Sequence, residues 1–308
     1  MRTKAILVMV LASGCTSVGG DGGSGSSADG GANASDAGGA DAAPAVTACS
    51  EPQDGPLALE ITYDAPADLT GGTLELQGSE TWSLTEPDGS GRLGAHGVRS
   101  ELRYGDTEAY GGARAETAVV GESTSRYATG DSSFYGFSLW LPAGWVDDGD
   151  VEDILFEWHD ISDADEAGKA PNLVVAVQRD ELVARITSDA NAISTPETEL
   201  VERRLLVDGL DTTQGTWHDF VFHVVWSYEA QGGLVEAWSK RADETEYRKV
   251  LEKTGPNQHN DDAAGYIKWG INKPAWLDGP TAPTVRVVMH DEIRVGESFG
   301  AVEPGCVR

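Results

Sequence analysis

The sequence is short of cysteine, of basic residues and of long hydrophobic runs, and each shortage excludes a class of protein. Its 308 residues include three cysteines, and none has a partner at C-x-x-C spacing, which argues against a zinc site. Lysine and arginine number 22 against 51 acidic residues, so the formal net charge is −29, which excludes a non-specific nucleic-acid binder. No run of 18 apolar residues is present, and the sequence therefore predicts no membrane-spanning helix.

The first residues have the pattern of an export signal. Arg2 and Lys4 precede a short apolar stretch, and small residues then lead to a cysteine in Leu11–Cys15. That segment resembles the lipobox of bacterial lipoproteins, in which the cysteine is lipidated and becomes the mature N-terminus. The resemblance implies that residues 1–14 are removed and that Cys15 anchors an exported protein at the outer membrane or cell surface. An ordinary cleaved signal peptide is the alternative.

The composition changes sharply near residue 49. Residues 15–48 consist mainly of Gly, Ser, Ala and Asp, which cannot bury a core, so we interpret them as a flexible tether. One folded domain is expected over residues 49–308, and Cys49 and Cys306 lie at its two ends. In an oxidising compartment a bridge between them can persist, so we predict a disulfide bond. Two free thiols are the alternative.

Short strands separated by turn residues dominate the expected domain. Runs of alternating or continuous apolar character recur between clusters of Gly, Pro, Asp and Asn, with hardly any helical periodicity. The pattern predicts an all-β sandwich or jelly roll. The runs are Leu57–Thr62, Gly72–Leu76, Phe134–Leu141, Ile154–His159, Leu173–Gln178, Leu182–Thr187, Trp217–Ser227, Leu234–Ser239, Tyr266–Ile271 and Val285–Val295. Val201–Val207 is ambiguous.

Three segments, namely Val98–Tyr104 and the runs that begin at Ile154 and at Tyr266, carry a row of charged or hydrogen-bonding side chains that core packing does not require. Side chains alternate between the two faces of a strand, so each segment has an apolar row and a polar row. The apolar rows are Ile154, Phe156 and Trp158, and Ile267, Trp269 and Ile271; the polar rows are Arg99, Glu101 and Arg103, then Glu157 and His159, then Tyr266, Lys268 and Asn272. We predict that the three polar rows meet on one concave sheet.

These segments and their order resemble a known family. RSELR at 99–103, a strand ending in WH at 158–159, and YIKWGI from residue 266 are similar to signature segments of jelly-roll alginate lyases and of the heparin lyase I and glucuronan lyase group. The resemblance extends over about residues 95–296. It implies a concanavalin A-like β-jelly roll, in which two sheets form a concave substrate groove, and β-elimination of a uronic-acid polysaccharide. Similar supporting segments are Tyr135–Pro142, Trp217–Ser227, Gly233–Trp238 and Asp291–Gly296.

The resemblance also implies roles for individual residues. A guanidinium of Arg103 or Arg99 would neutralise the substrate carboxylate through two hydrogen bonds. His159 would take the C5 proton, and Tyr266, with Lys268 stabilising its phenolate, would protonate the leaving oxygen. The other expected substrate contacts are Glu101, Glu157, Asn272 and Trp238. The alternative for the arginine row is a solvated ion-pair face.

Two positions depart from the family pattern. Glu157 stands where relatives commonly carry glutamine, and its carboxylate would repel the substrate carboxylate unless it is protonated or paired. Asn272 stands where the heparin lyase branch has tyrosine, which motivates a catalytically silent carbohydrate-binding protein as one alternative function. A jelly-roll glycoside hydrolase is another, with Glu157 as one of two carboxylates and no assignable partner.

The sequence also bears on bound ions and on binding partners. We expect no cofactor, although loop aspartates Asp147, Asp148 and Asp150 leave a structural calcium ion open. The strong negative charge favours a polymer that carries only carboxylates, such as glucuronan or alginate, over densely sulfated heparin. We expect a monomer that meets the membrane through its lipid alone. The histidines expected to be structural are His218, His223, His259 and His290, of which His223 interrupts an apolar run.

Overall fold

The structure is a computed structural model that describes residues 47–307, apart from 66–67, 70–71, 122, 167 and 211–212. Residues 1–46, with the predicted signal, Cys15 and most of the tether, lie outside the described residues. Most of the regular structure is β-strand; the helices described are η1 (Ser123–Ser125), η3 (Pro274–Leu277) and α1 (Phe299–Val302). No described helix has the length and hydrophobicity needed to cross a membrane.

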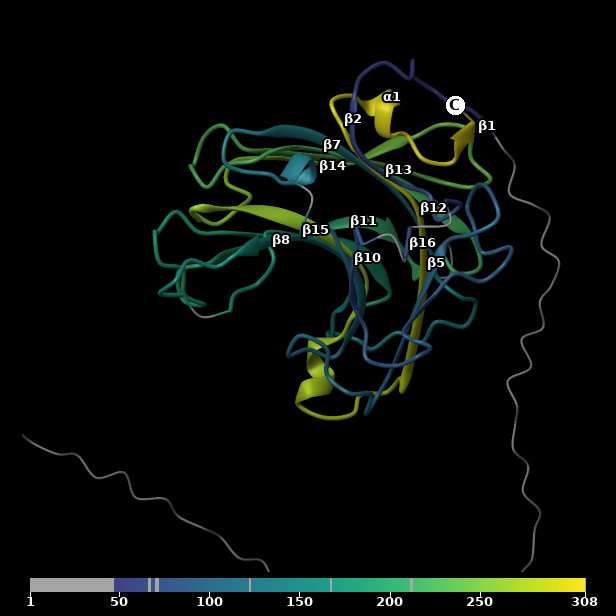
Figure 1. Ribbon diagram of the computed structural model, residues 1–308. Coiled ribbons are helices and arrows are strands. Elements are labelled where there is room, and N and C mark those ends of the chain that lie inside the picture. Colours follow the sequence, from purple (N-terminus) through teal and green to yellow (C-terminus); the bar gives the residue numbers. More distant parts are fainter. Residues whose placement is uncertain are drawn as a thin grey trace, which may run out of the picture. The chain divides into compact units, whose positions relative to one another are not determined.

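Two antiparallel sheets pack face to face, which confirms the predicted two-sheet jelly-roll class (Figure 1). The seven-stranded sheet has the order β11 (Leu200–Asp208), β10 (Glu181–Ser188), β9 (Leu173–Gln178), β8 (Asp153–Ile161), β15 (Ala263–Asn272), β6 (Arg114–Ala118) and β3 (Glu75–Gln77). The eight-stranded sheet has the order β14 (Arg248–Thr254), β13 (Leu234–Arg241), β12 (Trp217–Val225), β7 (Ser132–Trp140), β16 (Val285–Gly296), β5 (Val98–Arg103) and β4 (Leu84–Thr85), with β2 (Leu57–Ile61) beside β16.

The core fills the space between the two sheets and is rich in aromatic rings. Phe137 of β7 stacks on Phe156 of β8 with ring centroids 4.1 Å apart, which joins one sheet to the other. Phe156 and Trp158 face this core, as do Ile267, Trp269 and Ile271 of β15, so the predicted apolar rows are confirmed for these residues. Side chains of the intervening residues on β8 and β15 therefore point out of the sandwich.

Ile154 departs from the predicted row on β8. The pairing of β8 with β9 shifts in register between Ile154 and Phe156, and this irregularity turns Ile154 to the other face. There it packs with apolar side chains of β9 and β10, in a small cluster separate from the main core: Ile154, Val174, Ala176 and Val183. Alternation alone could not reveal this, because a bulge adds a residue to one strand only.

A disulfide bond joins the two ends of the described domain, as predicted. The sulfurs of Cys49 and Cys306 are bonded at 2.08 Å across a sequence separation of 257 residues. The bond lies beside a short parallel pair formed by β1 (Thr47–Ala48) and β17 (Cys306–Val307). Two strands of two residues have little hydrogen bonding of their own, and the covalent bond adds a strong constraint on these ends.

Removal of this bond should destabilise the protein. Because the bond closes a very long loop, the chain-entropy model gives it a large effect, and Cys49→Ser/Cys306→Ser should lose about 2–5 kcal/mol of unfolding free energy. Denaturant titration followed by tryptophan fluorescence measures the loss. Wild-type protein unfolded under reducing conditions should show the same loss, and a double variant within about 0.5 kcal/mol of oxidised wild type would contradict the prediction.

Candidate active site

Polar side chains gather on the outer face of the seven-stranded sheet, along β8, β15 and β6. The pairing of β8 with β15 sets Tyr266 opposite His159 and Lys268 opposite Glu157. On the far side of β15, β6 sets Arg114 opposite Asn272. Since residues directly opposite on paired strands have neighbouring side chains, three strands bring these groups onto one surface. We call this surface the polar face; it confirms that the predicted rows of β8 and β15 share one face.

His159 is oriented by its own strand. Its Nδ1 lies 2.6 Å from the main-chain oxygen of Asp160, and a carbonyl oxygen only accepts, so Nδ1 carries the proton. In the neutral ring Nε2 is therefore the basic nitrogen. Burial lowers the pKa of His159 below its ordinary 6.5, although the nearby Glu157 carboxylate acts in the opposite direction. The ring is neutral at physiological pH and its side chain stays 28% exposed, so a base is available at the surface.

Tyr266 lies against His159, with ring centroids 5.4 Å apart. Burial raises the pKa of its hydroxyl above 10.0, while Lys268 acts to lower it. The hydroxyl therefore remains protonated at neutral pH. Arg126 lies over the same ring, with its guanidinium carbon 5.4 Å from the ring centre. A phenol, an imidazole and a guanidinium thus meet at one end of the polar face.

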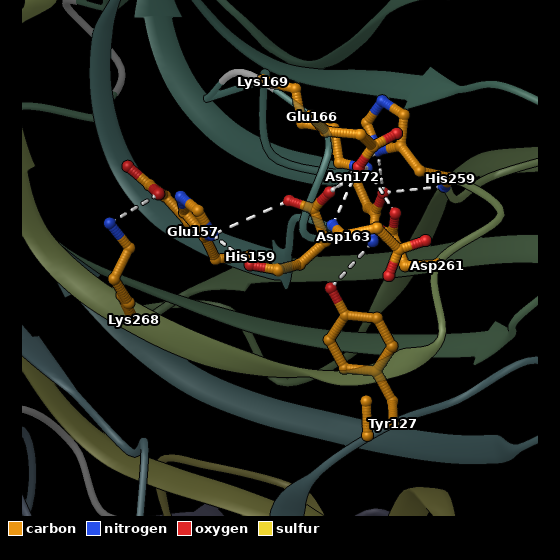
Figure 2. Close-up of polar contacts among 12 residues, drawn as sticks. Tyr127, Glu157, His159, Asp163, Glu166, Lys169, Asn172, His259, Asp261 and Lys268 are labelled. Atoms are coloured by element: carbon orange, nitrogen blue, oxygen red, sulfur yellow. Dashed lines mark hydrogen bonds and ion pairs between the residues drawn. The ribbon is translucent and has the colours of Figure 1, made fainter. Parts of the chain in front are cut away.

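A buried ion cluster lies next to this group. Lys268 Nζ is 2.9 Å from Glu157 Oε2 and 3.2 Å from Glu116 Oε2 (Figure 2 shows the pair with Glu157). Asn272 donates a 2.9 Å hydrogen bond to the other oxygen of Glu157, and Arg114 lies 3.3 Å from Glu116. Two carboxylates and two cations therefore balance one another in a nearly dry environment, where unpaired charges would be costly.

The two carboxylates of the cluster titrate in opposite directions. Burial and the neighbouring Glu157 raise the pKa of Glu116 from 4.5 to about 7. Burial also acts to raise the pKa of Glu157, but Lys268 and Asn272 outweigh it and the pKa of Glu157 is lowered. A glutamate is therefore tolerated where the family pattern has glutamine, because the charge of Glu157 is paired with the buried ammonium of Lys268.

Glu116 and Arg114 are functional candidates that sequence reasoning missed. Their strand, β6, has five residues and reads RAETA, with one small apolar residue facing the core and no long apolar row. The available signal was the alternation of Arg114 and Glu116 with Ala115 and Thr117, which is the same pattern as in the RSELR segment. Without knowledge of strand neighbours, that alternation does not distinguish one sheet from another.

The structure contradicts the predicted position of the RSELR arginines. Strand β5 belongs to the eight-stranded sheet, and its core-facing row of Val98 and Leu102 turns Arg99, Glu101 and Arg103 to the outer face of that sheet. Both sheet layers thus separate this row from His159 and Tyr266. The prediction that all three rows share one surface is wrong for β5.

The charged row on β5 forms a surface ion-pair network, which was the alternative to a substrate-binding role. Glu101 lies 2.5 Å from Arg99 and is also paired with Arg103. The Arg103 guanidinium is stacked over the Trp82 ring at 4.3 Å. These partners pair the charges of the row with one another, so the arginines of β5 need no substrate to explain them.

Trp238 is also absent from the polar face. It lies on β13 of the eight-stranded sheet, with Phe299 at 5.5 Å between ring centroids and Lys249 over its ring at 5.2 Å. The prediction that it contacts the same substrate as His159 is therefore wrong. Its ring is used in packing α1 against the sheet.

A second charged cluster lies beyond His159, at the end of β8. Lys169 pairs with Asp160 at 3.4 Å, with Glu166 at 2.5 Å and with Asp261 (Figure 2). His259 is buried between Asp160 at 3.2 Å and a further carboxylate. Because Asp160 supplies the carbonyl that orients His159, this cluster fixes the strand end that carries the base. The carboxylates of this cluster are close enough to bind a metal ion, but the ammonium of Lys169 already lies between them.

The loop aspartates considered for calcium have protein partners. Asp148 pairs with Lys273 at 2.6 Å, and Asp150 pairs with Arg179. Asp147 accepts hydrogen bonds from main-chain N–H groups, including that of Gly149 at 3.1 Å. Among the described residues, the three aspartates do not lie together as ligands of one ion. A calcium ion in this loop stays a prediction.

A family model described as polysaccharide lyase matches residues 68–294. The chain is similar to the endo-β-1,4-glucuronan lyase of the fungus Trichoderma reesei, with a TM-score of 0.63, 20% identity, and coverage of 77% of this chain and 96% of that one. It is also similar to the catalytic domain of a glycoside hydrolase family 131 protein from Coprinopsis cinerea, with a TM-score of 0.53, 13% identity, and coverage of 82% and 100%. At these identities the two structures support the fold alone. No curated protein matches the chain.

The pKa of Glu116 predicts a pH-dependent stability. Between pH 4.5 and about 7 the folded chain holds a proton that the unfolded chain has lost, so the contribution of Glu116 to stability falls as pH rises through this window. The fall amounts to at most about 3 kcal/mol. Glu116→Gln should remove it, as denaturant titrations at pH 5 and pH 8 would show.

A matched variant separates this effect from general changes in charge. Glu75 lies on neighbouring β3 and is partly exposed, outside the buried ion cluster, so we expect Glu75→Gln to keep the wild-type difference between the two pH values. If Glu116→Gln keeps that difference as well, the carboxyl of Glu116 is not the titrating group.

Proposed function

The chain belongs to the polysaccharide lyase family, and we propose that it cleaves a uronic-acid polysaccharide by β-elimination. In this reaction a base removes the C5 proton, the bond from C4 to the glycosidic oxygen breaks, and the leaving oxygen gains a proton. Negative charge develops beside a group that is already a carboxylate, so the site must supply donors to that carboxylate. The observation that carries the proposal is the pairing of His159 with Tyr266 on one partly exposed surface.

His159 is the proposed base. Its protonated Nδ1 is held by the carbonyl of Asp160, which leaves Nε2 free to take a proton. The lowered pKa keeps the ring neutral, and hence able to accept, at physiological pH. A base whose orientation is fixed by the strand itself needs no rearrangement when substrate binds.

Tyr266 is the proposed acid. Its raised pKa keeps the hydroxyl protonated until the leaving oxygen develops charge. Lys268 lies two residues along the same strand and favours the phenolate that remains after donation. His159 and Tyr266 lie side by side, so the proton leaves and returns on one side of the sugar ring.

Arg126 is the proposed partner of the substrate carboxylate, in place of Arg99 and Arg103. Its guanidinium lies over the Tyr266 ring and donates to the main-chain oxygens of Ala264, at 2.7 Å, and of Val120. A guanidinium has five N–H donors, so donors remain for a carboxylate. Further along the strands, Arg114 and Asn272 extend the polar face toward neighbouring sugars.

A polymer that carries carboxylates without sulfates fits this surface best. The net charge of −29 opposes the approach of a densely charged polyanion, while screening over about 8 Å at physiological salt confines the field of each charge to its neighbourhood. We propose glucuronan or alginate. The glucuronan lyase of Trichoderma reesei shares the fold, which makes glucuronan the first polymer to test.

The proposed setting is that of an exported lipoprotein. The pattern around Cys15 supports lipidation and attachment to the outer membrane or cell surface, and the Cys49–Cys306 disulfide fits an oxidising compartment. We propose that the protein acts as a monomer, that it needs no cofactor, and that the lipid is its contact with the membrane.

Loss of either proton-transfer group should strongly reduce turnover. His159→Ala and Tyr266→Phe should each lower kcat about 10²–10⁴-fold, because each removes one positioned acid or base. The assay follows the ultraviolet absorbance of unsaturated uronate on glucuronan, alginate, hyaluronan, heparin and pectate. Arg103→Ala is the matched control and should keep wild-type turnover, since both sheets separate Arg103 from the polar face.

The product distinguishes the alternatives. New reducing ends without the absorbance would indicate a hydrolase, and binding without turnover would indicate a silent carbohydrate-binding protein. Wild-type turnover in either His159→Ala or Tyr266→Phe would remove that residue from the mechanism.

The pH profile should report the same two groups. His159 must be neutral to act as base, so kcat/KM should fall on the acid side with an apparent pKa below 6.5. Tyr266 must be protonated to act as acid, so the alkaline fall should lie above pH 10.0. An acid limb well above 6.5, measured from initial rates across pH, would contradict the assignment of His159.

A further inference from the structure

A hydrogen-bonded chain of a serine, a histidine and a glutamate lies on the outer face of the eight-stranded sheet. Ser132 Oγ of β7 is 3.1 Å from His223 Nε2 of β12, and His223 Nδ1 is 2.9 Å from Glu236 Oε2 of β13. Three neighbouring strands thus supply one residue each. Both distances are within the range at which a nucleophile, a base and an orienting carboxylate act together.

The protonation pattern follows from the partners. An ionised carboxylate only accepts hydrogen bonds, so the Nδ1 of His223 carries the proton toward Glu236. Nε2 is then the basic nitrogen, and it faces the hydroxyl of Ser132. This arrangement, with the carboxylate at Nδ1 and the hydroxyl at Nε2, is that of serine hydrolase triads.

The base and the carboxylate are both held in place. The Phe134 ring is stacked on the His223 ring, with centroids 4.3 Å apart and planes 7° from parallel. Lys249 pairs with Glu236 at 2.5 Å. Burial alone would raise the pKa of Glu236, but the hydrogen bonds from Lys249 and His223 lower it, so the carboxylate remains ionised. His223 keeps 18% of its side-chain surface exposed.

Ser132 opens onto a cavity. The residue is exposed, and it lines a cavity of about 360 Å³. Leu57 and Val295 give this cavity an apolar wall, and Arg126 is the cation among its lining residues. Asp131 and Glu297 also line it. The space is adequate for a small acyl group, and the two carboxylates disfavour an anionic one.

We infer that Ser132, His223 and Glu236 form a second catalytic site, which hydrolyses short, neutral acyl esters such as an acetylated sugar hydroxyl. Ser132 Oγ attacks the ester carbonyl carbon while its proton passes to His223 Nε2. The bond from that carbon to the alcohol oxygen breaks, and the alcohol leaves with the proton of His223. Water then attacks acyl-Ser132, gives a proton to His223, and the carboxylic acid leaves as Ser132 recovers its hydrogen.

The serine, histidine and glutamate of this site are separate from the proton-transfer groups of the proposed lyase mechanism. Its three strands belong to the eight-stranded sheet, whereas His159 lies on the outer face of the seven-stranded sheet. Arg126 lines the cavity and also contacts Tyr266, so it is left unchanged in the test variants. Its guanidinium is the lining group that can stabilise the oxyanion.

A fluorophosphonate probe and p-nitrophenyl acetate test the site in the full chain. Intact mass should show one phosphonyl adduct, and peptide mapping should place it on Ser132. Ser132→Ala and His223→Ala should each lower labelling and ester hydrolysis about 10²-fold or more. Ser133→Ala, one residue along the same strand and lining the same cavity, should keep both.

Each contrary outcome overturns the inference. Absence of an adduct, an adduct on another residue, or equal ester hydrolysis by wild type and Ser132→Ala would mean that the three residues form a hydrogen-bonded surface network only. Thermal unfolding of Ser132→Ala at the wild-type temperature excludes misfolding as the cause of lost labelling.

Discussion

The antiparallel pairing of β8 with β15 is the constraint on which the candidate site depends. A single register sets His159 against Tyr266 and Glu157 against Lys268. Because side chains alternate with a period of two, a slip of one residue would turn every polar group of one strand into the core and every aromatic group out of it. The buried Phe156, Trp158 and Trp269 therefore specify the position of the polar groups as firmly as any contact among the polar groups themselves.

Within a strand, the sequence was a sound guide. The alternation of Ile267, Trp269 and Ile271 placed Tyr266 and Lys268 correctly on the outer face, and the run Leu173–Gln178 coincides with β9. Even Val201–Val207, which was ambiguous in sequence, lies within β11. These successes share a cause, since burial of one face leaves a periodic signal in the residues of the strand itself.

Between strands, the sequence offered no comparable guide. Arg99, Glu101 and Arg103 have the alternation expected of a site strand, and so do Arg114 and Glu116, yet one set lies on each sheet. Both outer faces accept charged rows, so residue type does not distinguish them. Similarity of the RSELR segment to a signature segment favoured the wrong strand, because β6 is short and carries a weak apolar row. Assignment to a sheet is a property of topology, which local patterns do not encode.

The Cys49–Cys306 bond has a mechanical consequence. Tension on the chain that precedes Cys49 passes through the two sulfurs into β17 as well as along the backbone. The load is then shared by both ends of the domain, and the two-residue pair of β1 with β17 does not have to resist peeling by itself. For a protein whose leader predicts attachment at a surface, such sharing would keep the sheets folded while the attached end is pulled.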